Sequence, residues 1–268
     1  MLAHGQPDED RLSAGSIPHA RADPSAPGTG ALNPGGVVTP RTWGLVLAAG
    51  IAAGVCSWLV TEGVMKAYLL SLLPPMKPIP TVEDARQIIR AKVVIGTVMF
   101  GMMGGLLGIA FGLAGGGWRR SVGAAGMAGA VGLLAGSAVV AGVAWVVLPF
   151  VYTRLDPQSH DLGTPLLYHE LLWSFAGAVG GGAFGLGAGG RSLWVRTAIG
   201  GWVGAALAIV VYELVGALAF PTHQTQFPLA GSPETRAMAW ILVALGAAIG
   251  MILAAKESKS EGEGAGLT

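Results

Sequence analysis

Long apolar stretches alternate with short polar segments along most of the chain. Each stretch approaches or exceeds the about 20 residues that an α-helix needs to cross a hydrocarbon core about 30 Å thick. One such stretch could be a buried helix of a soluble protein, whereas six in series predict an all-α integral membrane bundle of six transmembrane helices. The stretches that contain no Asp, Glu, Lys or Arg are 42–61, 93–118, 121–153, 171–190, 197–212 and 237–255.

Prolines and capping residues predict where these helices end and begin. Pro74 and Pro221 lie after apolar stretches and Pro149 lies near the end of one, and a proline inside a helix removes a backbone hydrogen bond. Thr and Ser residues that can cap a helix N-terminus precede the return stretches. We therefore expect a transmembrane domain at 42–256, with helices at about 42–73, 82–118, 121–149, 165–190, 196–220 and 233–256. The polar ends of the chain, 1–41 and 257–268, are expected to be disordered tails.

Glycines recur at every fourth position in the second and fourth apolar stretches, so each set forms one ridge along a helix. Ridges without side chains let helix backbones approach closely, as small residues do in membrane bundles. We therefore predict glycine-zipper packing along both helices. The expected helix-packing glycines are Gly104, Gly108, Gly112 and Gly116, and Gly177, Gly181, Gly185 and Gly189.

The two glycine ridges also suggest an internal repeat. Eight of the fourteen positions from 104 to 117 are identical to the residues seventy-three positions later. Each of three helix pairs has a proline, a polar loop and then a Thr or Ser cap: Thr81, Thr164 and Ser232. This pattern predicts three quasi-repeated helical hairpins, an arrangement found in transporters and in purely structural bundles.

Charge predicts the orientation and excludes several classes of function. The two shortest links carry only basic residues, and short basic loops stay in the cytoplasm. We therefore expect a multi-pass protein of the inner (cytoplasmic) membrane with both termini in the cytoplasm. The formal net charge of +1 gives no indication of nucleic-acid binding. The single cysteine, Cys56, cannot form an internal disulfide.

The ionisable residues near the ends of the apolar stretches are the candidate functional residues, because burying a charge in a membrane is costly. Glu62 and Glu213 occupy matching positions in the predicted repeat and could bind a cation or exchange protons. A structural interpretation is equally open. Arg90 and Arg236 begin the return helices of the same two hairpins, so Glu62 could pair with Arg90 and Glu213 with Arg236.

Weaker candidates lie on the same expected outer side. His169 and Glu170 could contribute to a metal site together with His160, Asp161 or His223, but their spacing matches no metal motif, so we predict no metal and no cofactor. Ser137 lies mid-span without a histidine or lysine at its depth, so no catalytic residue is expected and we predict that the protein is not an enzyme.

Two functional hypotheses follow. The first is a small cation- or proton-coupled transporter or channel in which Glu62 and Glu213 handle the ion. The second is a non-catalytic membrane scaffold or subunit that packs against itself or another membrane subunit through a glycine-rich face. In both hypotheses the lipid bilayer surrounds the protein.

Overall fold

The computed structural model describes residues 38–75, 81–154, 163–220 and 227–257, and within these ranges the chain is helical without strands. Six helices are long and apolar enough to cross a membrane, which confirms the predicted all-α, six-helix membrane class. Their bounds are α1 Pro40–Ala67, α2 Val82–Trp118, α3 Val122–Arg154, α4 Gly163–Ala188, α5 Arg191–Ala219 and α6 Pro233–Glu257, with a 3-10 turn, η1, at Leu69–Leu72. The expected disordered tails lie, except for a few residues, outside the described ranges.

Helix α1 begins earlier than the sequence suggested. Thr39 is its N-cap, and the Thr39 hydroxyl accepts a hydrogen bond from the backbone N–H of Thr42 at 3.3 Å. Pro40 occupies the first turn, where a missing N–H costs nothing. The predicted single helix to residue 73 is in fact α1 followed by η1.

Helix α3 does not end at Pro149, as the sequence predicted, but continues to Arg154. The proline removes only the hydrogen bond to the carbonyl four residues before it. The Thr153 hydroxyl then donates to the Pro149 carbonyl at 2.7 Å, inside the continuing helix. The turn that contains Pro149 therefore stays helical, as proline-containing turns of membrane helices can.

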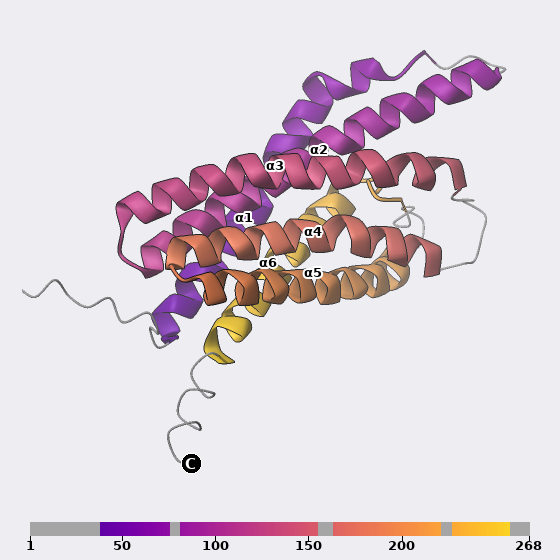
Figure 1. Cartoon of the computed structure of the whole chain (residues 1–268). Helices are drawn as coiled ribbons and strands as arrows, with labels where there is room; N and C mark the ends of the chain where they lie inside the picture. Colours follow the sequence, from indigo (N-terminus) through magenta and orange to yellow (C-terminus); the bar gives the residue numbers. More distant parts are fainter. Residues whose placement is uncertain (1–37, 76–80, 155–162, 221–226, 258–268) are drawn as a thin grey trace, which may run out of the picture. The chain divides into compact units, whose positions relative to one another are not determined.

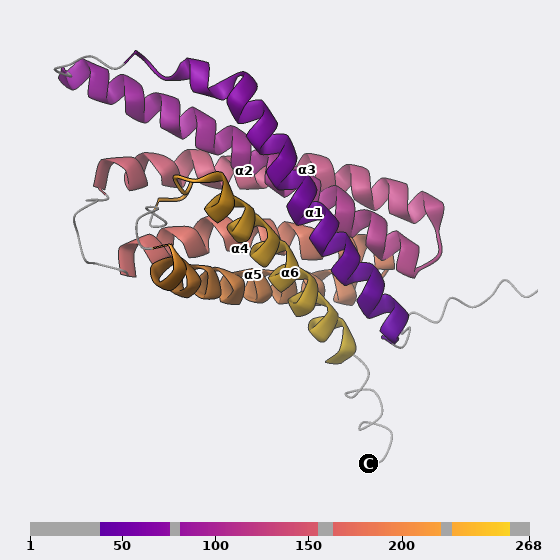
Figure 2. The same cartoon turned by 180° about the vertical axis from the view of Figure 1, so that it is seen from behind.

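Helices α2 and α4 form the middle of the bundle, since their apolar windows are 61% and 67% buried against 28–44% for the other spans. Helix α2 packs on α3, α4 and α1, and α4 packs on α5, α2 and α3. Helices α1 and α6 lie beside each other across one face of α2–α5 (Figures 1 and 2). The first residue of α1 and the last of α6 are therefore at the same end of the bundle (Figure 2).

The glycines of α2 lie directly against the backbone of α3. A methyl group at any of these four positions would overlap the facing chain. The facing residues are Gly136 for Gly104, Gly132 for Gly108, Ala128 for Gly112 and Ala125 for Gly116. Contacts of this kind replace side-chain packing with close backbone approach.

The glycines of α4 lie against α5 in the same way. Gly177 faces Gly201, Gly181 faces the backbone of Thr197, and Gly185 faces Trp194. Each glycine-rich helix thus packs on the helix that follows it. The three-hairpin repeat itself stays a prediction.

Gly189 is not a helix-packing residue, in contrast to the sequence prediction. It lies after the last residue of α4 with φ +88°, and its N–H donates to the Gly185 carbonyl at 3.0 Å. Gly190, with φ +117°, follows as the N-cap of α5. The two glycines therefore make the tight reversal between α4 and α5, a conformation that other residues rarely adopt.

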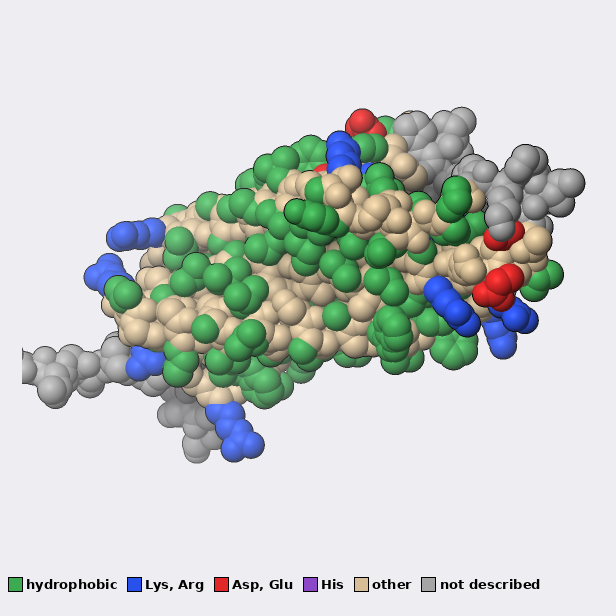
Figure 3. Space-filling view, turned by 90° about the horizontal axis from the view of Figure 1, so that it is seen from above, with side chains coloured by type: hydrophobic (Ala, Val, Ile, Leu, Met, Phe, Trp, Pro, Cys, Tyr) green, Lys and Arg blue, Asp and Glu red, His purple; other side chains and the backbone are tan. Residues whose placement is uncertain are grey.

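The surface is consistent with a lipid environment. Hydrophobic side chains and uncharged tan atoms cover the middle of the face shown in Figure 3, and the charged side chains lie mostly toward its ends. Exposed leucines, valines and tryptophans occur on the outward sides of the spans, for example Leu134, Trp145 and Leu207. A multi-pass membrane protein is the class that this pattern supports.

Candidate functional site

Four ionisable residues come together at one end of the bundle. Glu62 lies near the end of α1, Arg236 near the start of α6, His169 near the start of α4 and Glu213 near the end of α5. Three are almost fully buried, with exposed fractions of 6% for Glu62, 8% for Arg236 and 1% for His169. Buried ionisable groups require partners, and each of these has one.

Glu62 and Arg236 form a buried ion pair between α1 and α6. The Arg236 Nε donates to Glu62 Oε1 at 2.5 Å, and Arg236 Nη1 donates to the carbonyl of Ala230 at 2.6 Å. The second carboxylate oxygen, Glu62 Oε2, is buried and has no hydrogen-bond partner among the residues that the structure describes. The arginine therefore neutralises the glutamate and also fixes the segment that precedes α6.

Close packing of α1 on α6 sets the depth of this pair. Gly54 lies against the backbone of Trp240 and Ile241, so the two helices approach closely there. One turn farther along α1, the Trp58 indole N–H donates to the Pro233 carbonyl at 3.1 Å. These contacts place the end of α1 beside the start of α6, which brings Glu62 to Arg236.

The pairing differs from the one expected from the sequence. Glu62 does not pair with Arg90, and Glu213 does not pair with Arg236. Arg90 is exposed on α2 and forms no ion pair with a described residue. The reason is that α6 packs beside the end of α1. Its Arg236 therefore takes the place next to Glu62 that the sequence prediction gave to Arg90 of α2.

Glu213 pairs with His169, the residue given only a weak role by the sequence. The His169 Nδ1 and Glu213 Oε1 are in hydrogen-bond contact, and His169 Nε2 lies 3.1 Å from the carbonyl of Phe227. Figures 1 and 2 show α4 and α5 running side by side, which makes this contact possible. Tyr212 packs its ring edge-on against the imidazole at 6.2 Å between centroids.

The two contacts of the His169 imidazole limit how hydrogens can be arranged on the pair. A carbonyl only accepts, so His169 Nε2 must carry a hydrogen. Nδ1 and the carboxylate oxygen can then bond only if one further proton lies on one of them. The pair is neutral in either arrangement. Loss of that proton would leave two acceptors facing each other and a net negative charge beside the buried imidazole, which is unfavourable.

The segment Phe227–Ser232 connects the two pairs. Its Phe227 carbonyl bonds to His169, its Ala230 carbonyl to Arg236, and its Ser232 hydroxyl accepts from the Thr235 N–H at 3.3 Å. Ala230 is 4% exposed, so the segment covers part of this end of the bundle. The side chains of four helices are thus linked to one short stretch of backbone.

Aromatic residues separate the polar groups from the rest of the core. Trp173 and Trp240, one turn deeper than His169 and Arg236, meet edge-on with 5.8 Å between ring centroids. Phe100 meets Trp173 at 5.1 Å. The side chains below this layer form an apolar cluster that includes Met103, and the polar groups are therefore confined to one end.

Glu170 takes no part in either pair. Its Oε2 accepts a hydrogen bond from Ser174, one turn along α4, at 3.2 Å. Within the described ranges no three His, Cys, Asp or Glu residues are close enough to hold a metal ion. His160, Asp161 and His223, which the sequence offered as further ligands, lie outside these ranges.

The sequence did not predict the contribution of backbone carbonyls, because a loop carbonyl carries no residue signature. It did contain a signal for His169. His169 and Glu213 lie at similar distances on either side of the short α4–α5 link, so antiparallel helices bring them to the same depth. Comparisons of the chain with protein-family models, with curated proteins and with solved structures find no match.

Proposed function

We propose that this protein is a small transporter coupled to protons or cations, with His169 and Glu213 as the proton-carrying pair. One observation carries the proposal: the buried imidazole of His169 contacts the partly exposed Glu213 carboxylate through Nδ1 and the Phe227 carbonyl through Nε2. Ionisable groups buried in membrane spans are commonly parts of proton relays or ion pathways.

The pair could couple proton binding to movement. With the proton present, His169 bonds to both Glu213 and Phe227. Without it, the contact of His169 Nδ1 with Glu213 is repulsive, whereas Nε2 keeps the hydrogen that it donates to Phe227, so the change falls on the contact between α4 and α5. Glu62 is the poorer proton carrier, because Arg236 already neutralises it and anchors the other end of the same segment.

The proposed orientation places the polar layer away from the cytoplasm. Arg119, Arg120 and Arg191 lie at the opposite end of the helices, in or beside the two short links. Short basic links favour the cytoplasmic side, so both chain ends would lie there, in an inner membrane. The pair of His169 and Glu213 would then exchange protons with the solution on the side of the membrane opposite the cytoplasm.

Reconstitution into lipid vesicles tests the proposal. We expect an imposed pH gradient to drive proton flux through the wild type, and Glu213→Gln to reduce this flux to that of empty vesicles because it removes the titrating oxygen. Glu170→Gln is the matched control, since Glu170 lies beside His169 in sequence and bonds only to Ser174 among the described contacts. Flux is read from a pH-sensitive dye inside the vesicles.

The outcome is decisive in both directions. Flux that is lost in Glu213→Gln and retained in Glu170→Gln supports the pair as the carrier. A wild type that is silent with protons and with Na⁺ or K⁺ gradients contradicts transport, and equal flux in the wild type and Glu213→Gln contradicts the assignment of the residue.

A second candidate is a non-catalytic scaffold or subunit, which a groove between α5 and α6 favours. The groove has a volume of about 580 Å³ and is apolar along its whole length. Four glycines, Gly200, Gly204, Gly246 and Gly250, lie along it where the two helices touch. A helix of a partner protein could pack closely in this groove. Binding that partner would then be the function of the protein, and no transport activity would be required.

A further inference from the structure

The start of α2 extends well beyond the thickness of a membrane core. Its 37 residues make a helix about 55 Å long, against a hydrocarbon core of about 30 Å. Its N-terminus is fixed by a capping box, in which Thr81 and Asp84 bond to each other's backbone N–H. Figure 1 shows the end of α1 and the start of α2 diverging from α3 as a hairpin. The first turns of α2 therefore lie at the depth of the lipid headgroups.

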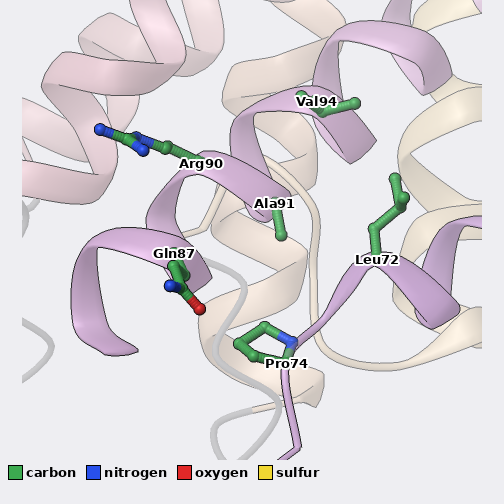
Figure 4. Close-up of a pocket in the computed structure, with 6 residues that line it drawn as sticks. All are labelled: Leu72, Pro74, Gln87, Arg90, Ala91 and Val94. Carbon is green, nitrogen blue, oxygen red and sulfur yellow. The ribbon is translucent and has the colours of Figure 1, made fainter. Parts of the chain in front are cut away.

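A groove lies between this part of α2 and the chain that follows η1. Its volume is about 340 Å³, and most of its wall is apolar. Figure 4 shows Leu72 and Pro74 on one side, and Ala91 and Val94 of α2 on the other. Gln87 lies one turn closer to the helix start, so the groove has a polar end and an apolar end.

Arg90 is the positively charged residue among those that line the groove. It is exposed and has no ion-pair partner among the described residues, and Figure 4 shows its side chain extending away from Leu72 and Pro74. The neighbouring cations are different. Arg86 lies 3.9 Å from Glu83, and the Lys92 ammonium lies over the Tyr152 ring at 5.7 Å. Arg90 is therefore available to an anion from outside the chain.

We propose that this groove binds one anionic phospholipid. The phosphate lies at Arg90 and the Gln87 amide, and an acyl chain lies along Leu72, Ala91 and Val94. Two observations favour this occupant, an exposed guanidinium without an ion-pair partner among the described residues and an adjacent apolar wall, and the depth inferred for the start of α2 agrees with them. A phospholipid carries the matching anion and hydrocarbon in one molecule.

Lipid titration of the full-length protein in neutral detergent, followed by native mass spectrometry, tests the site. The probes are phosphatidylglycerol and phosphatidylcholine with identical acyl chains. We expect the wild type to prefer phosphatidylglycerol, and Arg90→Gln to weaken its binding about fivefold. Arg86→Gln removes the same charge one turn away and is expected to leave the preference intact.

A second variant tests the groove itself. Val94 is exposed, so Val94→Phe fills the apolar end without disturbing the core, and we expect it to weaken the binding of both lipids. An unchanged preference in Arg90→Gln, or unchanged binding in Val94→Phe, overturns the proposal. Competition by glycerol 3-phosphate would identify a soluble anion instead. A dimer that Val94→Phe dissociates without any effect on lipid would place a second copy of the chain in the groove.

Discussion

Arg236→Met is expected to lower the free energy of unfolding by about 3–5 kcal/mol, because it leaves the Glu62 carboxylate buried without its cation. Glu62 is 6% exposed, and its Oε2 already lacks a hydrogen-bond partner, so no described group replaces the guanidinium. The variant also frees the Ala230 carbonyl that Arg236 holds at 2.6 Å. Unfolding of the purified protein in mixed detergent micelles measures the change.

A double-mutant cycle separates the pair from a general loss of packing. Glu62→Gln removes the charge that Arg236→Met leaves behind, so the double variant should be more stable than Arg236→Met alone. Lys66→Met is the control, since Lys66 is exposed near the end of α1 and is expected to change stability by less than about 0.5 kcal/mol. Strictly additive losses for Glu62→Gln and Arg236→Met would contradict the ion pair.

The pairing itself illustrates what the sequence can predict. The lengths of the apolar stretches predict six helices, because membrane thickness fixes how many residues a span needs. They do not predict which helices touch. Glu62 and Arg90 belong to one hairpin, and proximity in sequence made them the natural pair. In the structure α6 packs on α1 through Gly54, and Arg236, not Arg90, forms the ion pair with Glu62.

The contact between His169 and Glu213, in contrast, follows from the sequence. Helices α4 and α5 are joined by a two-residue link, so their register follows from the chain. The register that places Gly181 beside Thr197 and Gly177 beside Gly201 brings residue 169 within one turn of residue 213. This site could have been predicted from the glycine ridge. The carbonyls of Phe227 and Ala230 could not, because their positions depend on how an irregular segment folds over the helices.

The predicted end of α3 at Pro149 was wrong for a related reason. Proline predicts the end of a helix where water can bond the backbone groups that it frees. In a membrane span, where water is absent, continuing the helix leaves fewer backbone groups without a hydrogen bond than ending it does. In the structure α3 continues through Pro149 to Arg154. The rule that proline ends a helix thus failed here, because a non-helical backbone costs more free energy in a membrane than in water.

Gly108→Leu is expected to destabilise the bundle by at least about 3 kcal/mol, because the position faces backbone rather than a movable side chain. A Cβ at Gly108 would overlap the carbonyl and Cα of Gly132, and Gly132 faces Gly108 in the same way. The helices can accept a side chain only by moving apart. Separation would also loosen the neighbouring contact between Gly104 and Gly136. Gly108→Ala should show a smaller loss of the same sign.

Gly126→Leu is the matched control, on the exposed side of α3. A Cβ there meets nothing within 4 Å, so the added side chain points into lipid and only the helix propensity changes. Stability in detergent should be equal to or slightly above that of the wild type. If Gly108→Leu and Gly126→Leu unfold alike, close backbone approach between α2 and α3 is not what holds the bundle together. If only Gly108→Leu is destabilised, the glycine contacts between α2 and α3 stabilise the part of the bundle on which α4 packs, and α4 carries the His169 that contacts Glu213.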